Sequence, residues 1–101
     1  MMRAFVLAAG LVACSGKAGA PVTHQVEIHG MQFVPAELAV QVGDTIVWTN
    51  VDVLPHTVTG ASFDSQQMAA KAVFQYTVMD AGDYPYGCTF HPTMRGKLTA
   101  K

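Results

Sequence analysis

Hydrophobic and polar residues alternate with a period of two through several stretches of this chain. Val26 and Ile28 are separated by a polar residue, and similar alternation runs through residues 38–42 and 45–49. Such alternation places one face of a β-strand against a core and the other in solvent. Further strands are predicted, from β-branched and aromatic residues or from renewed alternation, at 73–78, 84–88 and 97–100.

Turn-forming residues separate the predicted strands. Gly43-Asp44 ends one run, and residues 80–83 combine two aspartates with a glycine. Short alternating strands joined by turns of this composition are typical of an all-β sandwich or barrel. Residues 62–71 break the pattern, and we expect either a helical turn or an irregular loop there.

The composition and charge narrow the class of protein. The chain has 101 residues, of which 50% are hydrophobic and 13% are charged. This length favours one domain, and this composition favours a packed core over disorder. The formal net charge is −1 and the sequence has no basic cluster. A nucleic-acid-binding protein is therefore excluded, because such proteins carry a basic patch.

The amino-terminal region has the pattern of an export signal. Residues 1–3 carry a positive charge, and residues 4–13 form an apolar stretch that is too short to span a bilayer. We therefore expect the folded domain to lie outside the cytoplasm, in the periplasm of a bacterium. Retention of the segment as an uncleaved helix would place the domain there too.

Two cleavage sites are possible. The run ending at Cys14 resembles that of bacterial lipoproteins, which predicts a signal peptide of residues 1–13 and lipid attachment at Cys14. Small residues at 18–20 instead fit ordinary secretory cleavage, giving a signal peptide of residues 1–20, although the following Pro21 usually hinders such a cut. On the lipoprotein route, small and polar residues at 14–22 form a flexible tether to a domain of residues 23–101.

Cys88 is the one cysteine outside the signal region. Exported proteins usually pair their cysteines, because the compartment is oxidising. An unpaired thiol is exposed to oxidation there unless something occupies it. A bound metal ion would protect it.

Candidate ligands surround this cysteine. His91 and Met94 follow Cys88 at spacings of three and six residues, and His56 lies upstream after Pro55. One thiolate, two imidazoles and a thioether are the ligands of a blue-copper electron-transfer site. Each residue alone has an ordinary interpretation, as a packing residue or a turn. Zinc is the chief metal alternative, but structural zinc sites do not use thioether ligands.

The chain resembles the cupredoxins and, within that family, the amicyanins. The likeness extends over residues 24–99 and rests on residues 42–45, 48–50, 55–56, 81–84 and 88–97. It implies a Greek-key β-sandwich with one copper ion at one end, held by His56, Cys88, His91 and Met94. The short spacing between His91 and Met94 is that of the amicyanins. The resemblance also implies an electron carrier rather than an enzyme.

Two further residues are expected near the ligands. Asn50 falls where the resemblance implies an asparagine that ties the two ligand loops together. Phe90 stands where the nearest relatives usually have proline, and unlike proline it has a backbone N–H. That N–H is expected to donate to the Cys88 sulfur, which would favour Cu(I). We therefore predict a higher reduction potential than in a Phe90→Pro variant.

The resemblance implies that electrons pass through the exposed edge of His91, inside a small apolar patch that docks redox partners. The candidates for this patch are Met31, Phe33, Leu54, Pro55, Pro92 and Thr93. Met31, Phe33 and Leu54 have core packing as the alternative. We expect a monomer that meets a dehydrogenase or a cytochrome in transient complexes.

Three functions remain to be separated. The first is a one-electron carrier that cycles between Cu(I) and Cu(II). The second is a periplasmic copper-trafficking module that hands Cu(I) to a partner. The third is a structural β-sandwich with incidental ligands. Two other histidines, His24 and His29, are expected to be solvated on opposite faces of a strand.

Overall fold

The computed structural model describes residues 19–101. Cys14, the predicted signal peptide of residues 1–13 and most of the alternative of residues 1–20 lie outside the described residues, as does the first part of the predicted tether. Among residues 19–101, no helix has the length and apolarity needed to cross a membrane.

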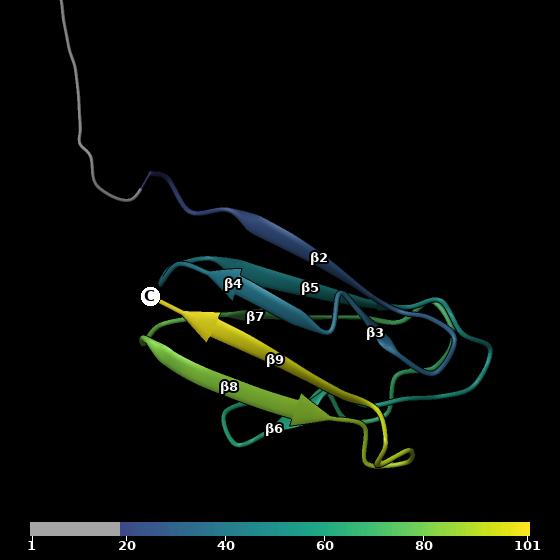
Figure 1. Ribbon diagram of the computed structural model, residues 1–101. Helices are drawn as coiled ribbons and strands as arrows, with labels where there is room; N and C mark the ends of the chain where they lie inside the picture. The colour runs from purple at the N-terminus through teal and green to yellow at the C-terminus, as the bar shows by residue number, and fades with distance from the viewer. Residues whose placement is uncertain (1–18) are drawn as a thin grey trace, which may run out of the picture.

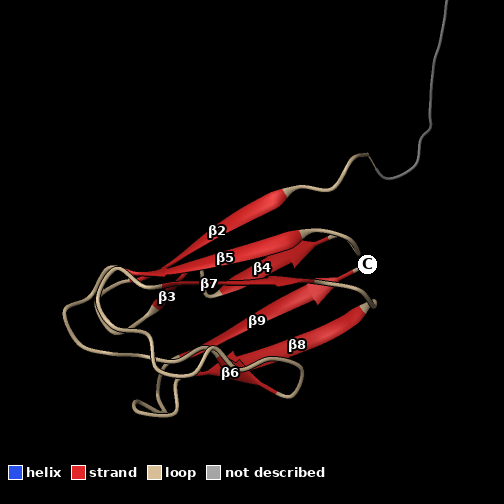
Figure 2. Cartoon of the chain, turned by 180° about the vertical axis from the view of Figure 1, so that it is seen from behind, coloured by secondary structure: helices blue, strands red, loops and turns tan. Residues whose placement is uncertain are grey.

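The described chain is built from strands, arranged as two layers (Figures 1 and 2). One sheet has the order β3-β2-β5-β7, and the other has the order β4-β9-β8-β6. The all-β sandwich is therefore confirmed. In chain order, the strands are β2 (Thr23–Ile28), β3 (Phe33–Val34), β4 (Glu37–Val40), β5 (Thr45–Asn50), β6 (Thr59–Gly60), β7 (Val73–Thr77), β8 (Gly82–Gly87) and β9 (Arg95–Ala100).

Strand β5 lies in the middle of the first sheet. It pairs in parallel with β2 and antiparallel with β7. Its alternate residues Ile46, Trp48 and Asn50 are fully buried, as the period of two requires when one face covers a core. The Trp48 ring meets Tyr86 of the opposite sheet edge-on at 5.4 Å, so these two rings join the layers.

Strand β9 lies in the second sheet between β4, to which it is parallel, and β8, to which it is antiparallel. Gly96 of β9 lies against the Tyr86 ring, so that any side chain at this position would collide with the ring. This close approach lets Tyr86 fill the core beside the last residues of β8. Cys88 follows directly after β8 and so begins the loop that leads to β9.

Residues 62–71 form an irregular segment with an isolated bridge rather than a helical turn. His56 N donates to Met68 O at 3.1 Å, and Met68 N donates to His56 O at 2.8 Å. Met68 is 2% exposed. The segment therefore covers the His56 loop and fixes the backbone of His56.

Different loops and chain segments lie at the two ends of the sandwich. The β2–β3 turn, the loop after β5 and the β8–β9 loop gather at one end, while the carboxyl terminus and the start of β2 lie at the other (Figure 1). At that second end, Val22 N donates to Asp44 Oδ1 at 2.9 Å, and Thr45 N donates to Val22 O at 3.0 Å. The last residue of the predicted tether is thus hydrogen-bonded to the domain.

Candidate metal centre

Three of the four predicted ligands converge at the loop end of the sandwich. The Cys88 Sγ atom lies 3.8 Å from His56 Nδ1 and 3.7 Å from His91 Nδ1. The three ligand atoms lie within 4.8 Å of one another. Cys88 is 3% exposed and His56 is fully buried, whereas His91 is half-buried. One side of the cluster is therefore closed to water, and His91 lies on the side that meets the surface.

The loop from Cys88 to Met94 is closed by its own backbone. Met94 N donates to His91 O at 2.9 Å, and Cys88 N donates to Met94 O at 3.3 Å. Met94 is 2% exposed and belongs to the hydrophobic core. The three downstream residues are thus held on one compact turn between β8 and β9, as their spacing predicted.

This donor set fits one copper ion. A thiolate and two imidazoles serve Cu(II), and sulfur ligands serve Cu(I), so the site accommodates both oxidation states. Met94 adds a thioether sulfur at the position in the loop where the resemblance predicts a weak axial ligand. A structural zinc site would call for four cysteine or histidine ligands, and residues 19–101 place three such side chains together.

Thr57 ties the two ligand loops together. Its backbone N–H donates to Cys88 Sγ at 3.4 Å, and its hydroxyl oxygen accepts the Thr89 N–H at 2.9 Å. The hydroxyls of Thr57 and Thr89 are also 3.2 Å apart. Thr57 follows His56, and Thr89 follows Cys88. These bonds therefore set the distance between the first imidazole and the thiol.

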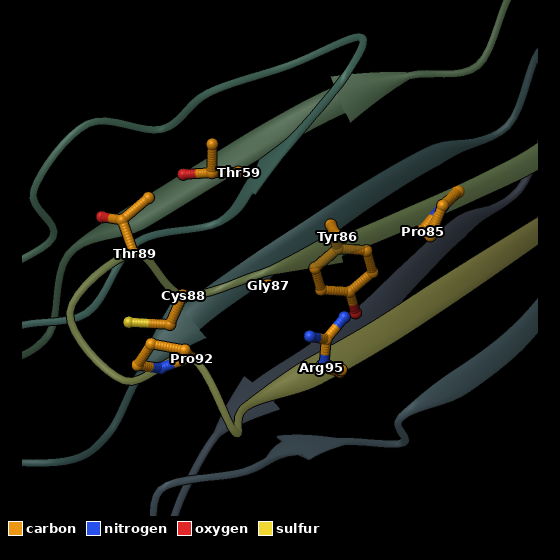
Figure 3. A pocket seen from close by; sticks show the side chains of 8 residues that line it. All are labelled: Thr59, Pro85, Tyr86, Gly87, Cys88, Thr89, Pro92 and Arg95. Atoms are coloured by element: carbon orange, nitrogen blue, oxygen red, sulfur yellow. The ribbon is translucent and has the colours of Figure 1, made fainter.

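A cleft of about 350 Å³ opens beside the thiol (Figure 3). Gly87 contributes no side chain to its wall, and Arg95 is its one charged lining residue. The remaining lining residues are Thr59, Pro85, Tyr86, Cys88, Thr89 and Pro92. Cys88 is nevertheless almost fully buried, so the cleft reaches its neighbourhood without exposing the sulfur.

Comparison with known proteins agrees with this architecture. The chain matches the Cupredoxin-like domain family over residues 2–100. The chain is a cupredoxin. It is 36% identical over 83 residues to amicyanin from Paracoccus denitrificans, a match that covers 75% of this chain and 63% of the relative. It is 32% identical to amicyanin-alpha from Methylorubrum extorquens, covering 99% of this chain and 100% of that relative.

This cupredoxin spans about three fifths of the length of the two Paracoccus amicyanins that it matches, with 63% and 61% covered. Among solved structures, a Cu(I) mutant of amicyanin has a TM-score of 0.75 at 32% identity, covering 78% of this chain and 82% of that one. A purple cupredoxin from Nitrosopumilus maritimus has a TM-score of 0.71 at 26% identity, covering 77% and 99%.

Asn50 does not have the role expected for it in this cupredoxin. Its amide Nδ2 donates to Leu54 O and to Met68 O, both at 3.0 Å, and its Oδ1 accepts the Asp52 N–H at 3.0 Å. Asn50 therefore holds the segment before His56 against the segment that covers it. The tie between the two ligand loops is made by Thr57. The sequence did contain a signal for this tie, because a hydroxyl residue directly follows each of two proposed ligands: Thr57 follows His56, and Thr89 follows Cys88.

Phe90 lies in the loop between Cys88 and His91, and the effect of its N–H on a copper-bound thiolate stays a prediction. The backbone N–H that donates to Cys88 Sγ is that of Thr57, and no acceptor for the Phe90 N–H is found among residues 19–101. The Phe90 side chain is 47% exposed. Its N–H therefore lies between two ligand residues without a partner.

Asp52 is a functional candidate that the sequence did not indicate. Its Oδ2 lies 2.9 Å from His56 Nε2, the ring nitrogen that does not face Cys88. The same carboxylate accepts the N–H groups of Gly30 at 2.8 Å and Met31 at 3.0 Å. The Met31 N–H, with smaller contributions from Gly30 and His56, holds the pKa of Asp52 below its ordinary value of 3.8, although desolvation opposes this. Asp52 is therefore a carboxylate at neutral pH.

The residues predicted for the docking patch differ in their exposure. The prediction that Phe33 lies in the surface patch is wrong. Its side chain is 2% exposed, and its ring packs edge-on against the Tyr86 ring with the ring centres 4.7 Å apart. It belongs to the core and is excluded from a surface patch. Met31 and Leu54 are 39% and 49% exposed. Pro92 and Thr93 are exposed as well, and Pro55 is half-buried. Val53, at 90% exposed, and Phe90 are apolar residues of this end that the prediction left out.

Proposed function

We propose that this cupredoxin binds one copper ion through His56, Cys88, His91 and Met94 and carries single electrons between redox proteins. The observation that supports this most strongly is the convergence of a buried thiol and two imidazoles within 4.8 Å. Bound copper would supply a one-electron couple between Cu(I) and Cu(II). The four ligands would fill the coordination sphere, which leaves no position for a substrate. We therefore propose a carrier rather than an enzyme.

The protein's own groups prepare this site. Cys88 has to lose its proton to bind, and the Thr57 N–H that points at its sulfur stabilises the thiolate. His56 and His91 have to be neutral at their Nδ1 atoms. Burial of Cys88 and His56 excludes water from the sulfur. The Thr57 bonds and the closed β8–β9 loop restrict ligand movement, which favours fast electron transfer.

The half-buried His91 is the proposed point of electron entry and exit. Exposed apolar side chains at the same end, including Leu54, Pro92 and Phe90, provide a surface for a transient redox partner. We propose a dehydrogenase or a cytochrome as that partner. The export pattern of the sequence supports a periplasmic location. Lipid attachment through Cys14 and a monomeric state remain proposals from the sequence.

Repeated redox cycling in the presence of a chelator tests this function. The copper-loaded protein is reduced and reoxidised several times with a Cu(I) chelator present, and bound copper is measured after each cycle. A carrier keeps its copper through all cycles. Progressive transfer of copper to the chelator would contradict the carrier function and favour copper trafficking. A Cys88→Ser variant, which lacks the thiolate, is the matched control for copper held elsewhere.

A further inference from the structure

Thr59 is linked to both ligand loops of this protein. Its backbone lies in β6 and pairs with Gly87 of β8, the residue directly before Cys88. Its hydroxyl donates to Thr57 Oγ1 at 2.9 Å, and Thr57 directly follows His56. Thr59 therefore connects the strand that leads to the thiol with the loop that carries the buried imidazole.

The hydroxyl of Thr57 is fully hydrogen-bonded by its neighbours. A hydroxyl group has one proton and two lone pairs. The Thr57 oxygen accepts the Thr59 O–H and the Thr89 N–H, both at 2.9 Å, which uses both lone pairs. Its own proton is then left for the Thr89 hydroxyl, whose oxygen lies 3.2 Å away. The side chains of Thr59 and Thr89 lie on the same side of Cys88 (Figure 3). Thr57 and Thr89 are therefore joined by two bonds that run in opposite directions, and the Thr59 O–H fixes this arrangement.

Asp64 supports Thr59 from the side away from the ligands. Its Oδ1 lies 3.2 Å from Thr59 Oγ1 and also accepts the Gln66 N–H at 2.9 Å. A carboxylate accepts hydrogen bonds and has no proton to donate. Asp64 therefore holds the Thr59 oxygen in place, but it cannot supply the proton that Thr57 accepts. That proton comes from Thr59.

The residue that Thr59 holds also contacts the thiol. The Thr57 N–H donates to Cys88 Sγ at 3.4 Å, and Thr57 is 4% exposed. The position of this N–H depends on the side-chain bonds that hold Thr57 against Thr89. Hydrogen bonds to a metal-bound sulfur are among the features that set a reduction potential. A residue that fixes Thr57 therefore acts on the sulfur without touching it.

We propose that Thr59 is a positioning residue that fixes the Thr57–Thr89 bonds and, through them, the Thr57 N–H on the Cys88 sulfur. In the copper form, this donor stabilises the electron-rich thiolate, lowers its donation to Cu(II) and so favours Cu(I). This second part rests on the proposed function. The alternative is a structural role for Thr59 through the backbone pairing of β6, which does not need the hydroxyl.

The first test needs no copper. Amide hydrogen exchange of Thr89 is measured by NMR on the metal-free wild type, Thr59→Val and Thr59→Ser. Valine keeps the shape of threonine without the hydroxyl, whereas serine keeps the hydroxyl. We expect the Thr89 N–H to exchange about tenfold faster in Thr59→Val, the equivalent of one lost hydrogen bond, and at nearly the wild-type rate in Thr59→Ser. Unchanged exchange in Thr59→Val would overturn the positioning role.

The matched control for both tests is Thr45→Val. Thr45 also lies in a strand and pairs its hydroxyl with another threonine hydroxyl, that of Thr77 at 2.8 Å, but in the other sheet. Thr45→Val should therefore leave Thr89 exchange unchanged. An equal acceleration in Thr45→Val would overturn the inference, because it would show that any lost hydroxyl pair loosens the ligand loops.

The second test uses the copper-loaded protein. In Thr59→Val we expect the preference for Cu(I) over Cu(II) to fall about threefold, which lowers the potential by about 28 mV at 59 mV for each tenfold change. Thr59→Ser should restore the wild-type potential, and Thr45→Val should not change it. A blue copper spectrum with an unchanged potential in Thr59→Val would overturn the inference alone, whereas failure of the wild type to form a blue site would overturn the proposed function.

Discussion

The two ends of strand β5 carry the same chemical arrangement. Asp44 precedes the strand and Asp52 follows it, so the six-residue strand, about 20 Å long, lies between them. Asp44 accepts the N–H groups of Val22 and Gln41, and its Oδ2 lies 2.8 Å from His24 Nε2. Asp52 accepts the N–H groups of a turn, and its Oδ2 lies 2.9 Å from a histidine Nε2. Each carboxylate therefore joins a histidine to two backbone groups.

The difference between the ends lies in what surrounds the second nitrogen of each ring. The His24 side chain is 22% exposed, whereas that of His56 is fully buried. Within residues 19–101, Cys and His side chains that are able to share a metal gather around His56. The pair at Asp44 fastens the start of the domain to its core, and the pair at Asp52 holds His56, a proposed copper ligand. An aspartate–histidine pair is thus not by itself evidence of a metal site. The evidence for such a site is that several side chains able to bind a metal ion lie close together.

The largest expected effect comes from removing the thiol. Cys88→Ser should abolish the blue absorption completely, because that band arises from thiolate-to-copper charge transfer. A buried hydroxyl in place of the thiol should lower the stability of the metal-free protein by only about 1 kcal/mol. The stabilisation of the wild type by copper should disappear, since a ligand stabilises only the state that binds it. Optical spectra and thermal unfolding with and without copper check both points, and a persistent blue band would contradict the assignment of Cys88.

Asp44→Asn tests the opposite end. The hydrogen bond from His24, followed by those from Gln41 and Val22, lowers the pKa of Asp44 from its ordinary value of 3.8 to about 2. A lowered pKa stabilises the folded state fully above about pH 4, and this stabilisation is lost as the pH falls toward 2.

The variant should therefore unfold more easily than the wild type at pH 5 and lose most of this difference near pH 2. Urea unfolding of metal-free samples across this range measures the effect. A stability difference that is independent of pH would show that the Asp44 charge is not what fastens this end.

Met94→Leu isolates the thioether from its packing. Leucine has a similar volume, and Met94 is 2% exposed, so the fold should be kept with a cost below about 1.5 kcal/mol. Loss of a weak sulfur ligand should leave the site blue and raise the potential by about 60 mV, the equivalent of a tenfold change for one electron. Voltammetry of the loaded variant provides the measurement. An unchanged spectrum and potential would mean that Met94 is a packing residue only.

The smallest effect is expected for Phe90→Pro. The Phe90 N–H has no acceptor among residues 19–101 and lies between Cys88 and His91, so it is available to a thiolate. Its removal should lower the potential by roughly a few tens of millivolts, less than one tenfold step of about 59 mV. Phe90→Ala, which keeps the N–H, is the control. An equal or higher potential in Phe90→Pro would remove this N–H from the copper environment.

The long strands of this fold were predictable because their alternation is local. Residues 45–49 alternate over a full strand, and β5 has that alternation in its burial. Strands β3 and β6 have two residues each, which is too short to show a period. Phe33 lies in β3, so no alternation around it could decide between the surface patch and the core packing that was its alternative. Its assignment to the surface patch was wrong for this reason.

The candidate site was predictable where its ligands share one loop. Cys88, His91 and Met94 are brought together by three-residue spacings, which are visible in the sequence. The roles of Asp52 and Thr57 depend on contacts with residues 21 and 32 positions away along the chain. Such contacts form because the chain passes from one sheet to the other and back. The local pattern of hydrophobic and polar residues does not show which distant segments then meet. His24, expected to be solvated, was missed for the same reason.

An optical and EPR titration of the purified protein with Cu(II) tests the central claim most directly. We predict that one equivalent gives an intense blue band and a narrow copper hyperfine splitting, both reversibly bleached by a reductant. These signals would arise from copper bound to the Cys88 thiolate together with His56 and His91, and they should be absent in Cys88→Ser. A pale spectrum with ordinary Cu(II) splitting would contradict the account, as would a colourless Cu(I) form that cannot be reoxidised.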